Sequence, residues 1–223
     1  MAKNACFGPE LFEFLLQLKR HNDREWFARN KPRYQAVVVE PALRFIGGFA
    51  PHLHRLSPHF VADARPMRGS LFRIYRDTRF AADKRPFKTH VGIHFSHASG
   101  KDAHAPLFYL HLEPEGCFAA AGVWHPDARA LTKLRSAVVR EPEQWAKLRR
   151  KLELEGETLQ RPPRGFDPQH PFIEDIKRKD FVASVGLSET QICGPKFMQE
   201  FARACRSMKP LVEFTTQALG LKF

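Results

Sequence analysis

The chain has 223 residues and a formal net charge of +12, from 36 basic and 24 acidic side chains. Hydrophobic residues make up 43% and charged residues 27%, which excludes wholesale disorder and predicts a folded core. The 20 phenylalanines, against three tryptophans and three tyrosines, predict that this core is rich in Phe. The positive charge favours anionic partners, either a small molecule or nucleic acid, but a basic solvated surface gives the same net charge.

The cysteines and the apolar stretches indicate in which cellular compartment the protein is expected. Cys6, Cys117, Cys193 and Cys205 show no paired spacing, so nothing predicts a disulfide framework. No run approaches the roughly 18 apolar residues of a membrane span, and the N-terminal MAKNACFGPE has no apolar signal core. We therefore expect a reduced, cytoplasmic protein with no membrane partner.

The first part of the chain has helical periodicity. Pro9 suits the first turn of a helix that ends near His21. Asp23 is the predicted cap of a short second helix. A third helix is expected to begin near Pro32, with Pro41 bending it or dividing it in two.

The middle of the chain alternates between apolar and polar side chains, which predicts strands. The predicted strands are 71–75, 91–95, 107–112 and 117–124, with a polar loop at 96–106 and a further strand at 181–185 that returns to the sheet edge. Consecutive strands with short links indicate an antiparallel meander.

Helical periodicity resumes after Pro126. Gly194 and Pro195 open the last predicted helix, which Pro210 is expected to bend or break. We therefore predict an α+β fold, in which a mainly antiparallel sheet is flanked by N-terminal and C-terminal helices. The predicted organisation is one domain over residues 1–223, helical at 8–56, a sheet at 66–125 and helical again at 126–223.

Charge is densest between the first two predicted strands, in RIYRDTRFAADKRPFK (residues 73–88). At least five cations there face two carboxylates, and converging guanidinium groups repel one another unless an anion neutralises them. Arginine binds phosphate and carboxylate groups in a fork geometry. The segment is therefore a candidate site for an anionic ligand, and the predicted ligand-binding residues are Arg73, Tyr75, Arg76, Arg79, Asp83, Lys84 and Lys88.

Asp77 is the one candidate catalytic residue in this segment, either orienting the arginines or acting as a base. The alternative is that Asp77 and Asp83 form an internal ion-pair network that fixes a long loop over the sheet. The sequence leaves both interpretations open.

Histidines and one cysteine are weaker candidates. His90, His94 and His111 fall on one face of the predicted sheet and could bind a metal, but their spacing matches no compact metal signature and no acidic residue accompanies them in the same run. We therefore assign no metal site. Cys193 is placed at a helix start, where the helix dipole lowers the pKa of a thiol, and ordinary packing is the alternative.

Common signatures of cofactor binding and hydrolysis are absent, including GxGxxG, GxxxxGK[ST], HExxH and GxSxG. The sequence therefore identifies no cofactor, leaves open whether the protein is an enzyme, and does not predict an oligomeric state.

The central segment also fits a family pattern, R-x-x-R-D-x-R-F followed by D-K and an aromatic residue. The matching positions are Arg73, Arg76, Asp77, Arg79, Phe80, Asp83, Lys84 and Phe87. Further similar stretches are residues 22–27, Asn30, Lys31, Tyr34, 179–181 and 194–197. Over nearly its whole length the chain resembles a bacterial family of conserved hypothetical proteins, a domain of unknown function. The departure from the pattern is Phe87, where Tyr is common, so a phenolic hydroxyl is missing there.

The resemblance implies where a site lies and no reaction, because the family has no assigned activity. It also implies that Trp26, Asn30, Lys31 and Tyr34 approach the motif. Three functions stay open: a protein or enzyme that binds an anionic small molecule, a nucleic-acid-associated protein that contacts backbone phosphates, and a structural or interaction module with an internal salt-bridge network.

Overall fold

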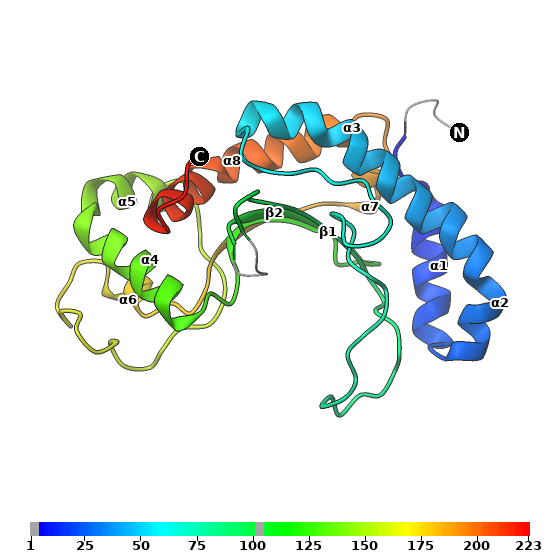
Figure 1. The fold of residues 1–223 in the computed structure, drawn as a ribbon, viewed down its shortest axis with the longest axis horizontal. Coiled ribbons are helices and arrows are strands. Elements are labelled where there is room, and N and C mark those ends of the chain that lie inside the picture. The colour runs from blue at the N-terminus through cyan, green and yellow to red at the C-terminus, as the bar shows by residue number, and fades with distance from the viewer. Residues whose placement is uncertain (1–4, 101–104) are drawn as a thin grey trace.

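The computed structural model describes residues 5–100 and 105–223, so residues 1–4 of the N-terminus and 101–104 of the predicted polar loop lie outside it. The helices are α1 (Pro9–Arg20), α2 (Arg24–Tyr34), α3 (Glu40–Leu56), α4 (Ala128–Arg140), α5 (Pro142–Arg149), α6 (Ile173–Ile176), α7 (Glu189–Ile192) and α8 (Phe197–Ala218). The strands are β1 (Val91–Ser96), β2 (Leu107–Leu112), β3 (Phe118–Val123) and β4 (Phe181–Gly186). Figure 1 shows an arch, with α3 and α8 over the convex face of a curved sheet, α1 and α2 at one end and α4 to α6 at the other.

The first helix begins and ends as the sequence predicts, and the second begins at the predicted cap. Pro9 stands in the first turn of α1, and His21 follows its last residue. The apolar stripe of α1 is buried at Leu11, Phe12, Phe14, Leu15 and Leu18. The carboxylate of Asp23 caps α2 by accepting a hydrogen bond from the backbone N–H of Trp26 at 2.8 Å. Local capping chemistry therefore sets the corner between α1 and α2.

A separate helix beginning at Pro32 is a wrong prediction, because Pro32 lies inside α2. The chain continues from α2 through a π-helical turn, η1 (Gln35–Val39), into α3. Pro41 stands in the first turn of α3 and lacks the N–H that would bond to the carbonyl four residues before it. The backbone N–H of Glu40 bonds instead to the carbonyl of Gln35, five residues back. Pro41 therefore coincides with a change of helix type, and the helical region continues from α2 into α3.

The strands form one antiparallel sheet in the order β1-β2-β3-β4. The first three strands follow one another along the chain, and β4 returns to the sheet edge beside β3 after the helices α4 to α6. The predicted α+β class, the meander and the return strand near residue 181 are confirmed.

Residues 71–75 do not form the predicted strand, since only isolated bridges join this segment to its neighbours. Leu71 and Ile74 are buried, whereas Phe72 and Tyr75 are exposed. The buried positions are therefore three residues apart and not two, so the segment has no continuous apolar face to place on the core.

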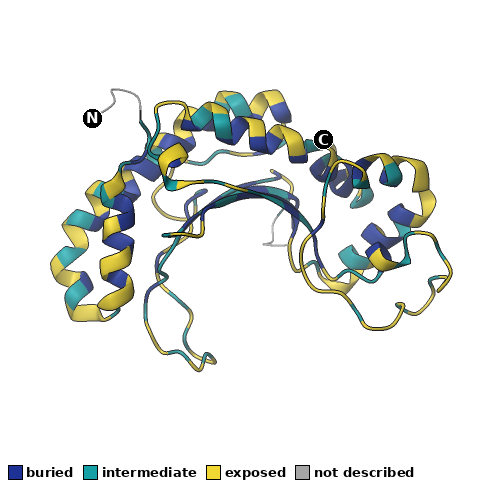
Figure 2. Ribbon diagram, turned by 180° about the vertical axis from the view of Figure 1, so that it is seen from behind, coloured by how far each residue is buried: buried dark blue, intermediate teal, exposed yellow. Residues whose placement is uncertain are grey.

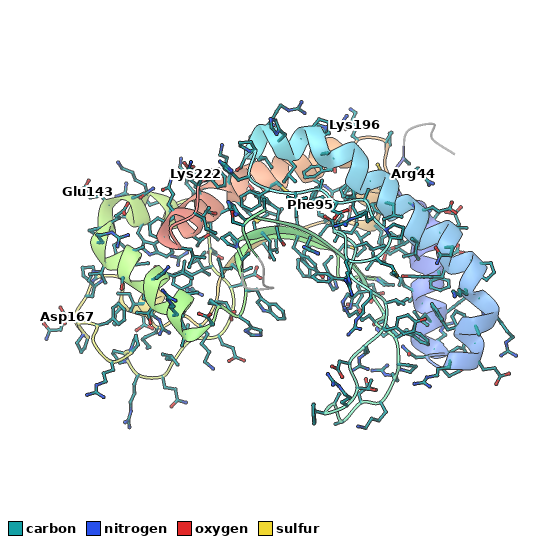
Figure 3. All side chains as sticks on the ribbon, in the orientation of Figure 1. Arg44, Phe95, Glu143, Asp167, Lys196 and Lys222 are labelled. Atoms are coloured by element: carbon teal, nitrogen blue, oxygen red, sulfur yellow. The ribbon has the colours of Figure 1, made fainter. Side chains whose placement is uncertain are left out.

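Phenylalanine rings fill the layer between the sheet and its covering helices, as the composition predicts. Phe95 of β1 lies in this layer (Figure 3), with its ring centroid 4.9 Å from that of Phe49 in α3 and 6.1 Å from that of Phe201 in α8. Figure 2 shows buried residues along the strands and the inner sides of the helices. The buried cluster extends from Phe7 to Phe214, and we propose on that ground that the chain forms a single domain.

The last helix does not break at Pro210, because α8 continues unbroken on both sides of it. Packing of α8 against β3, β4 and α3 offsets the cost of a proline inside a helix, which is about 3 kcal/mol. Within residues 5–100 and 105–223, no helix combines the length and the apolar character that a membrane span requires.

Replacing Gly122 in β3 by alanine is expected to destabilise the protein by about 2–3 kcal/mol. Gly122 has a positive φ of 127°, and a Cβ built there would meet the backbone carbonyl of Phe181 in β4. Gly186, the last residue of β4, has no heavy atom within 4 Å of a built Cβ. Gly186→Ala is therefore the matched control, with an expected change within about 0.5 kcal/mol. Urea unfolding tests the pair, and equal stabilities would contradict the account of Gly122.

Candidate functional site

The charged segment forms an irregular hairpin that extends from the sheet, and we call residues 70–88 the basic arm (Figure 1). Its two sides are joined by backbone hydrogen bonds from Lys88 N–H to the carbonyl of Ile74 at 2.8 Å and from Arg76 N–H to the carbonyl of Pro86 at 2.9 Å. The base of the arm is thus ordered by its backbone, and residues 77–85 form its tip.

Two aspartates organise the tip through short-range ion pairs. Asp77 binds the Nη2 of Arg79 and Asp83 binds the Nη2 of Arg85, each at 2.7 Å. Asp83 also binds the Nη1 of Arg76 at 2.7 Å. The hydrogen bonds from Arg79 lower the pKa of Asp77 to about 2. Bonds from Arg85 and then Arg76 hold the pKa of Asp83 well below its usual range.

The predicted catalytic residue is therefore already engaged in this arrangement. Asp77 accepts hydrogen bonds from both the side chain and the backbone N–H of Arg79. A carboxylate with such a low pKa is a weak base near neutral pH. The geometry favours a counter-ion role for Asp77 over a base.

The arm packs against the corner between α1 and α2. The amide of Asn22 donates to the carbonyl of Phe87 and accepts from its backbone N–H, both at 3.0 Å. The ring of Phe27 in α2 stacks on that of Phe87 with centroids 4.2 Å apart, and the Tyr75 ring lies 5.4 Å from Phe87. Hydrogen bonds and aromatic contacts therefore fix the arm relative to α2.

Between α2 and the arm lies an open cleft of about 370 Å³, which we call the α2–arm cleft. Its lining consists of Arg24, Phe27, Ala28 and Lys31 from α2, and Tyr75, Arg76, Thr78, Pro86 and Phe87 from the arm. Among the residues that the structure describes, the lining contains three cations and no carboxylate. Small-molecule sites in proteins have volumes from about 300 Å³ upward.

The cations of this cleft differ in how far they are already neutralised. Across residues 5–100 and 105–223, neither Arg24 nor Lys31 makes an ion pair, and both side chains are exposed. Arg76 is paired with Asp83, which lies outside the lining. The cleft therefore has a net positive charge that an anion would neutralise.

The other predicted ligand-binding residues lie outside the cleft lining. At the tip, the Nζ of Lys84 donates to the carbonyl of Thr78 at 3.1 Å. On the arm's base, the Nζ of Lys88 lies 5.2 Å from the ring centroid of Phe72. Burial, and then the charge of Arg73, lowers the pKa of Lys88. The structure thus brings only Tyr75 and Arg76 of the predicted set into the cleft.

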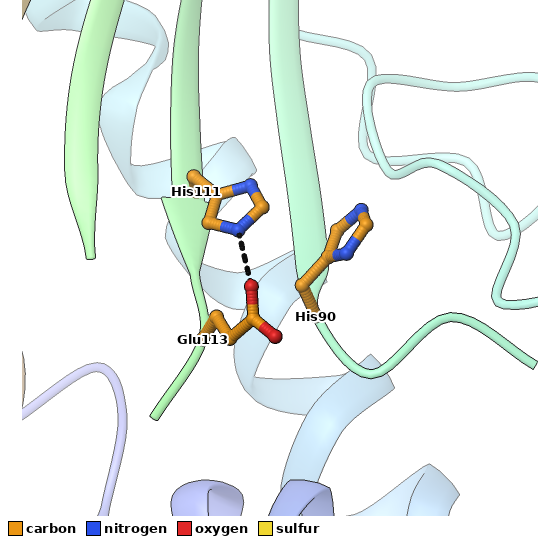
Figure 4. Close-up of side chains that lie close together, drawn as sticks. All are labelled: His90, His111 and Glu113. Atoms are coloured by element: carbon orange, nitrogen blue, oxygen red, sulfur yellow. Dashed lines mark hydrogen bonds and ion pairs between the residues drawn. The ribbon is translucent and has the colours of Figure 1, made fainter. Parts of the chain in front are cut away.

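The structure places two of the three predicted histidines together and the third apart from them. His90 and His111 lie together, with ring centroids 4.5 Å apart, and Glu113 accepts from the Nε2 of His111 at 3.2 Å (Figure 4). His94 stands apart from them, with its ring stacked on Phe72 at 4.5 Å and its Nδ1 2.8 Å from the hydroxyl of Ser96. Two imidazoles and a carboxylate are a donor set that can hold a metal ion.

The electrostatics of this histidine cluster follow from burial. Burial, followed by the neighbouring His111 and Lys88, lowers the pKa of His90 to about 4. Burial also lowers the pKa of His111, and the carboxylate of Glu113 opposes that shift. Both imidazoles are therefore neutral near pH 7, the form that binds metals.

Residues 10–214 match the sequence pattern of a family described as "Conserved hypothetical protein (DUF2461)". The chain belongs to this family. The matched residues include both α2 and the basic arm. No curated protein and no solved structure gave a significant match.

The match confirms the family expected from the sequence, and the DUF2461 description assigns no ligand or reaction. The residues implied to approach the motif have different surroundings. Lys31 lines the cleft together with Arg76, and the Tyr34 ring packs on Phe27 at 5.3 Å. Trp26 packs on Phe14 and His21, and the amide of Asn30 donates to the carbonyl of Trp26.

Sequence reasoning missed Arg24 and Phe27 as cleft residues and Glu113 as a partner of the histidines. Arg24, Phe27, Ala28 and Lys31 follow the spacing i, i+3, i+4, i+7 of one helix face, a signal that could have identified them. His111 and Glu113 alternate along a strand, so their side chains share a sheet face.

The prediction that Cys193 stands at a helix start is wrong. Cys193 follows the last residue of α7, and α8 begins only at Phe197. Burial, and then the carboxylates of Glu189 and Glu10, raises the pKa of the Cys193 thiol. The thiol is therefore not activated, which agrees with ordinary packing.

Replacing Asn22 by alanine is expected to destabilise the protein by about 1–3 kcal/mol, because the backbone N–H and carbonyl of Phe87 lose their partner. The arm should also become more sensitive to trypsin, which cleaves after its many basic residues. Urea unfolding and limited trypsin digestion measure the two effects. Asn30→Ala is the control, since the amide of Asn30 donates to the carbonyl of Trp26 inside α2 itself. Equal trypsin sensitivity of both variants would contradict the docking role of Asn22.

Proposed function

We propose that the protein binds a small anionic ligand, one that bears a phosphate or carboxylate group, in the α2–arm cleft. The observation that carries the proposal is the lining itself, in which Arg24, Lys31 and Arg76 occur without a carboxylate. Such a lining repels other cations and attracts an anion of matching size.

The roles of the lining residues follow from their chemistry. Arg76 offers a planar fork that suits phosphate or carboxylate oxygens, and its Nη1 is held by Asp83. Lys31 and Arg24 supply charge from the opposite wall. Tyr75, whose ring is half exposed, offers an apolar surface for the rest of the ligand. The volume of the cleft suits a small molecule.

The residues of the arm tip then serve the site indirectly. The ion pairs of Asp77 with Arg79 and of Asp83 with Arg85 order the tip, and Lys84 caps the carbonyl of Thr78. We propose that Arg73, Lys84 and Lys88 add positive potential around the cleft and that the lining holds the ligand, whereas the charge of Arg79 is neutralised by Asp77.

The internal salt-bridge alternative predicts arginines buried against carboxylates with no adjoining cavity. The side chain of Arg79 is instead 77% exposed, and Arg76 borders the cleft. Association with nucleic acid is supported by the net charge alone. The anion-binding cleft is therefore the function that the geometry favours.

The test is a calorimetric titration of tag-free protein with inorganic pyrophosphate, inorganic phosphate and citrate, after treatment with EDTA to remove metal ions. We expect saturable binding of one equivalent of at least one of these probes. Absence of saturable binding by all three would overturn the proposal. A parallel titration with single-stranded DNA and RNA separates the alternatives, because tight binding with a steep salt dependence would favour the nucleic-acid function.

A further inference from the structure

Strand register brings together three metal-ligating side chains on the sheet face opposite α3 and α8. In the antiparallel pair of β1 and β2, Gly92 lies opposite His111 and Val91 lies opposite Leu112. Continuing that register by one residue places His90 beside Glu113. Side chains two residues apart in a strand share a face, so His111 and Glu113 point the same way. Figure 4 shows His90, His111 and Glu113 side by side.

The donor atoms of these side chains converge. One ligand atom from each of His90, His111 and Glu113 lies within 4.8 Å of the other two. Of these atoms, the Nε2 of His111 and the Oε2 of Glu113 lie 3.2 Å apart. The side chains of His111 and Glu113 are 13% and 30% exposed, so the cluster is sheltered but reachable from solvent. An ion held at about 2.0–2.2 Å from each donor would draw the three side chains closer together.

Neighbouring groups hold the donors in place. The hydroxyl of Tyr109 lies 3.0 Å from the Nδ1 of His111, and the hydroxyl of Thr89 donates to the Oε1 of Glu113 at 3.3 Å. The ring of Phe118 stacks on His111 with centroids 4.6 Å apart. A ligating histidine whose second nitrogen is hydrogen-bonded has a fixed orientation and tautomer.

Gly92 is part of this arrangement. A Cβ built at Gly92 would lie 2.7 Å from the hydroxyl of Tyr109. The missing side chain therefore leaves the space across which Tyr109 reaches His111. The support around His111 depends on a glycine directly opposite it in the sheet.

We propose that His90, His111 and Glu113 form a binding site for a divalent transition-metal cation. Two imidazoles and one carboxylate match the preferences of ions such as Zn²⁺, Fe²⁺ and Co²⁺, whereas Mg²⁺ and Ca²⁺ prefer oxygen ligands alone. Three protein ligands leave further coordination positions for water or another molecule. The site is separate from the α2–arm cleft, since none of its three residues belongs to that lining.

Titration of tag-free, EDTA-treated protein with Zn²⁺ and with Co²⁺ tests the proposal. We expect one equivalent to bind to the wild type and to raise its Tm. His111→Ala and Glu113→Gln should each weaken binding by at least about a hundredfold, since even loss of a supporting residue costs about tenfold to a hundredfold. His94→Gln is the matched control, because His94 lies on the same face but bonds to Ser96, and it should bind like the wild type.

Glu113→Gln also keeps the test decisive if His111→Ala does not fold, because glutamine preserves the size of the side chain. Circular dichroism of each metal-free variant checks the fold before titration. The proposal is overturned if the wild type binds no more tightly than Glu113→Gln, or if His94→Gln loses as much affinity as the ligand variants. In that case the cluster is a Tyr–His–Glu hydrogen-bond chain without a metal.

Discussion

Lys31→Ala is expected to weaken binding of the anionic probe by about tenfold to a hundredfold, with little change in stability. Lys31 lines the α2–arm cleft from an exposed position on α2, and it makes no ion pair within residues 5–100 and 105–223. Its removal therefore deletes charge from the cleft without leaving a carboxylate unpaired. The expected factor is that of one charge-assisted hydrogen bond.

Arg76→Ala should have at least the same effect, and the double variant with Lys31→Ala should show no measurable binding. Calorimetric titration with the probe that binds the wild type provides the measurement. Arg79→Ala is the matched control, because Arg79 lies on the same arm but outside the cleft lining. If Arg79→Ala weakens binding as much as Lys31→Ala, the arm acts through its general charge and the cleft is not the site.

Asp175→Ala is expected to destabilise the protein by about 3–5 kcal/mol. The buried carboxylate of Asp175 accepts hydrogen bonds from Trp145 Nε1 at 2.8 Å, Arg149 Nε at 3.0 Å and Arg178 Nε at 3.1 Å. Its loss leaves two guanidinium groups and an indole N–H without their acceptor. These donors come from α5 and from the chain after α6, so Asp175 joins the helices at the end of the arch away from the arm.

The neighbouring residue provides the control for Asp175. Glu174 is 75% exposed and pairs with Lys177 at the surface, so Glu174→Ala should change stability by less than about 1 kcal/mol. Urea unfolding of the two alanine variants measures the contrast. Similar midpoints for both would show that the Asp175 network contributes little.

The regular elements were largely predictable because local signals and periodicity agreed. Pro9 at a helix start, the Asp23 cap and the alternation along β1 and β2 each specify structure within a few residues. The wrong predictions concern segments whose conformation depends on tertiary packing more than on local sequence. Pro32 and Pro210 lie inside helices despite the local cost, and residues 71–75 contact the sheet through an isolated bridge without forming a strand.

The candidate site was predictable only in part. The motif identified the basic arm, but its charges alone could not show that Arg79 and Arg85 are neutralised within the tip. That Arg24 and Lys31 face Arg76 depends on how the arm docks on α2. This contact joins segments about fifty residues apart in the chain, and no periodicity encodes it.

The central claim is that the α2–arm cleft binds an anion, and a crystal structure of the protein soaked in phosphate tests it most directly. The account predicts density for the anion in this cleft, within hydrogen-bond distance of Arg76 and Lys31. Density at other surface cations with the cleft occupied by water alone would contradict it.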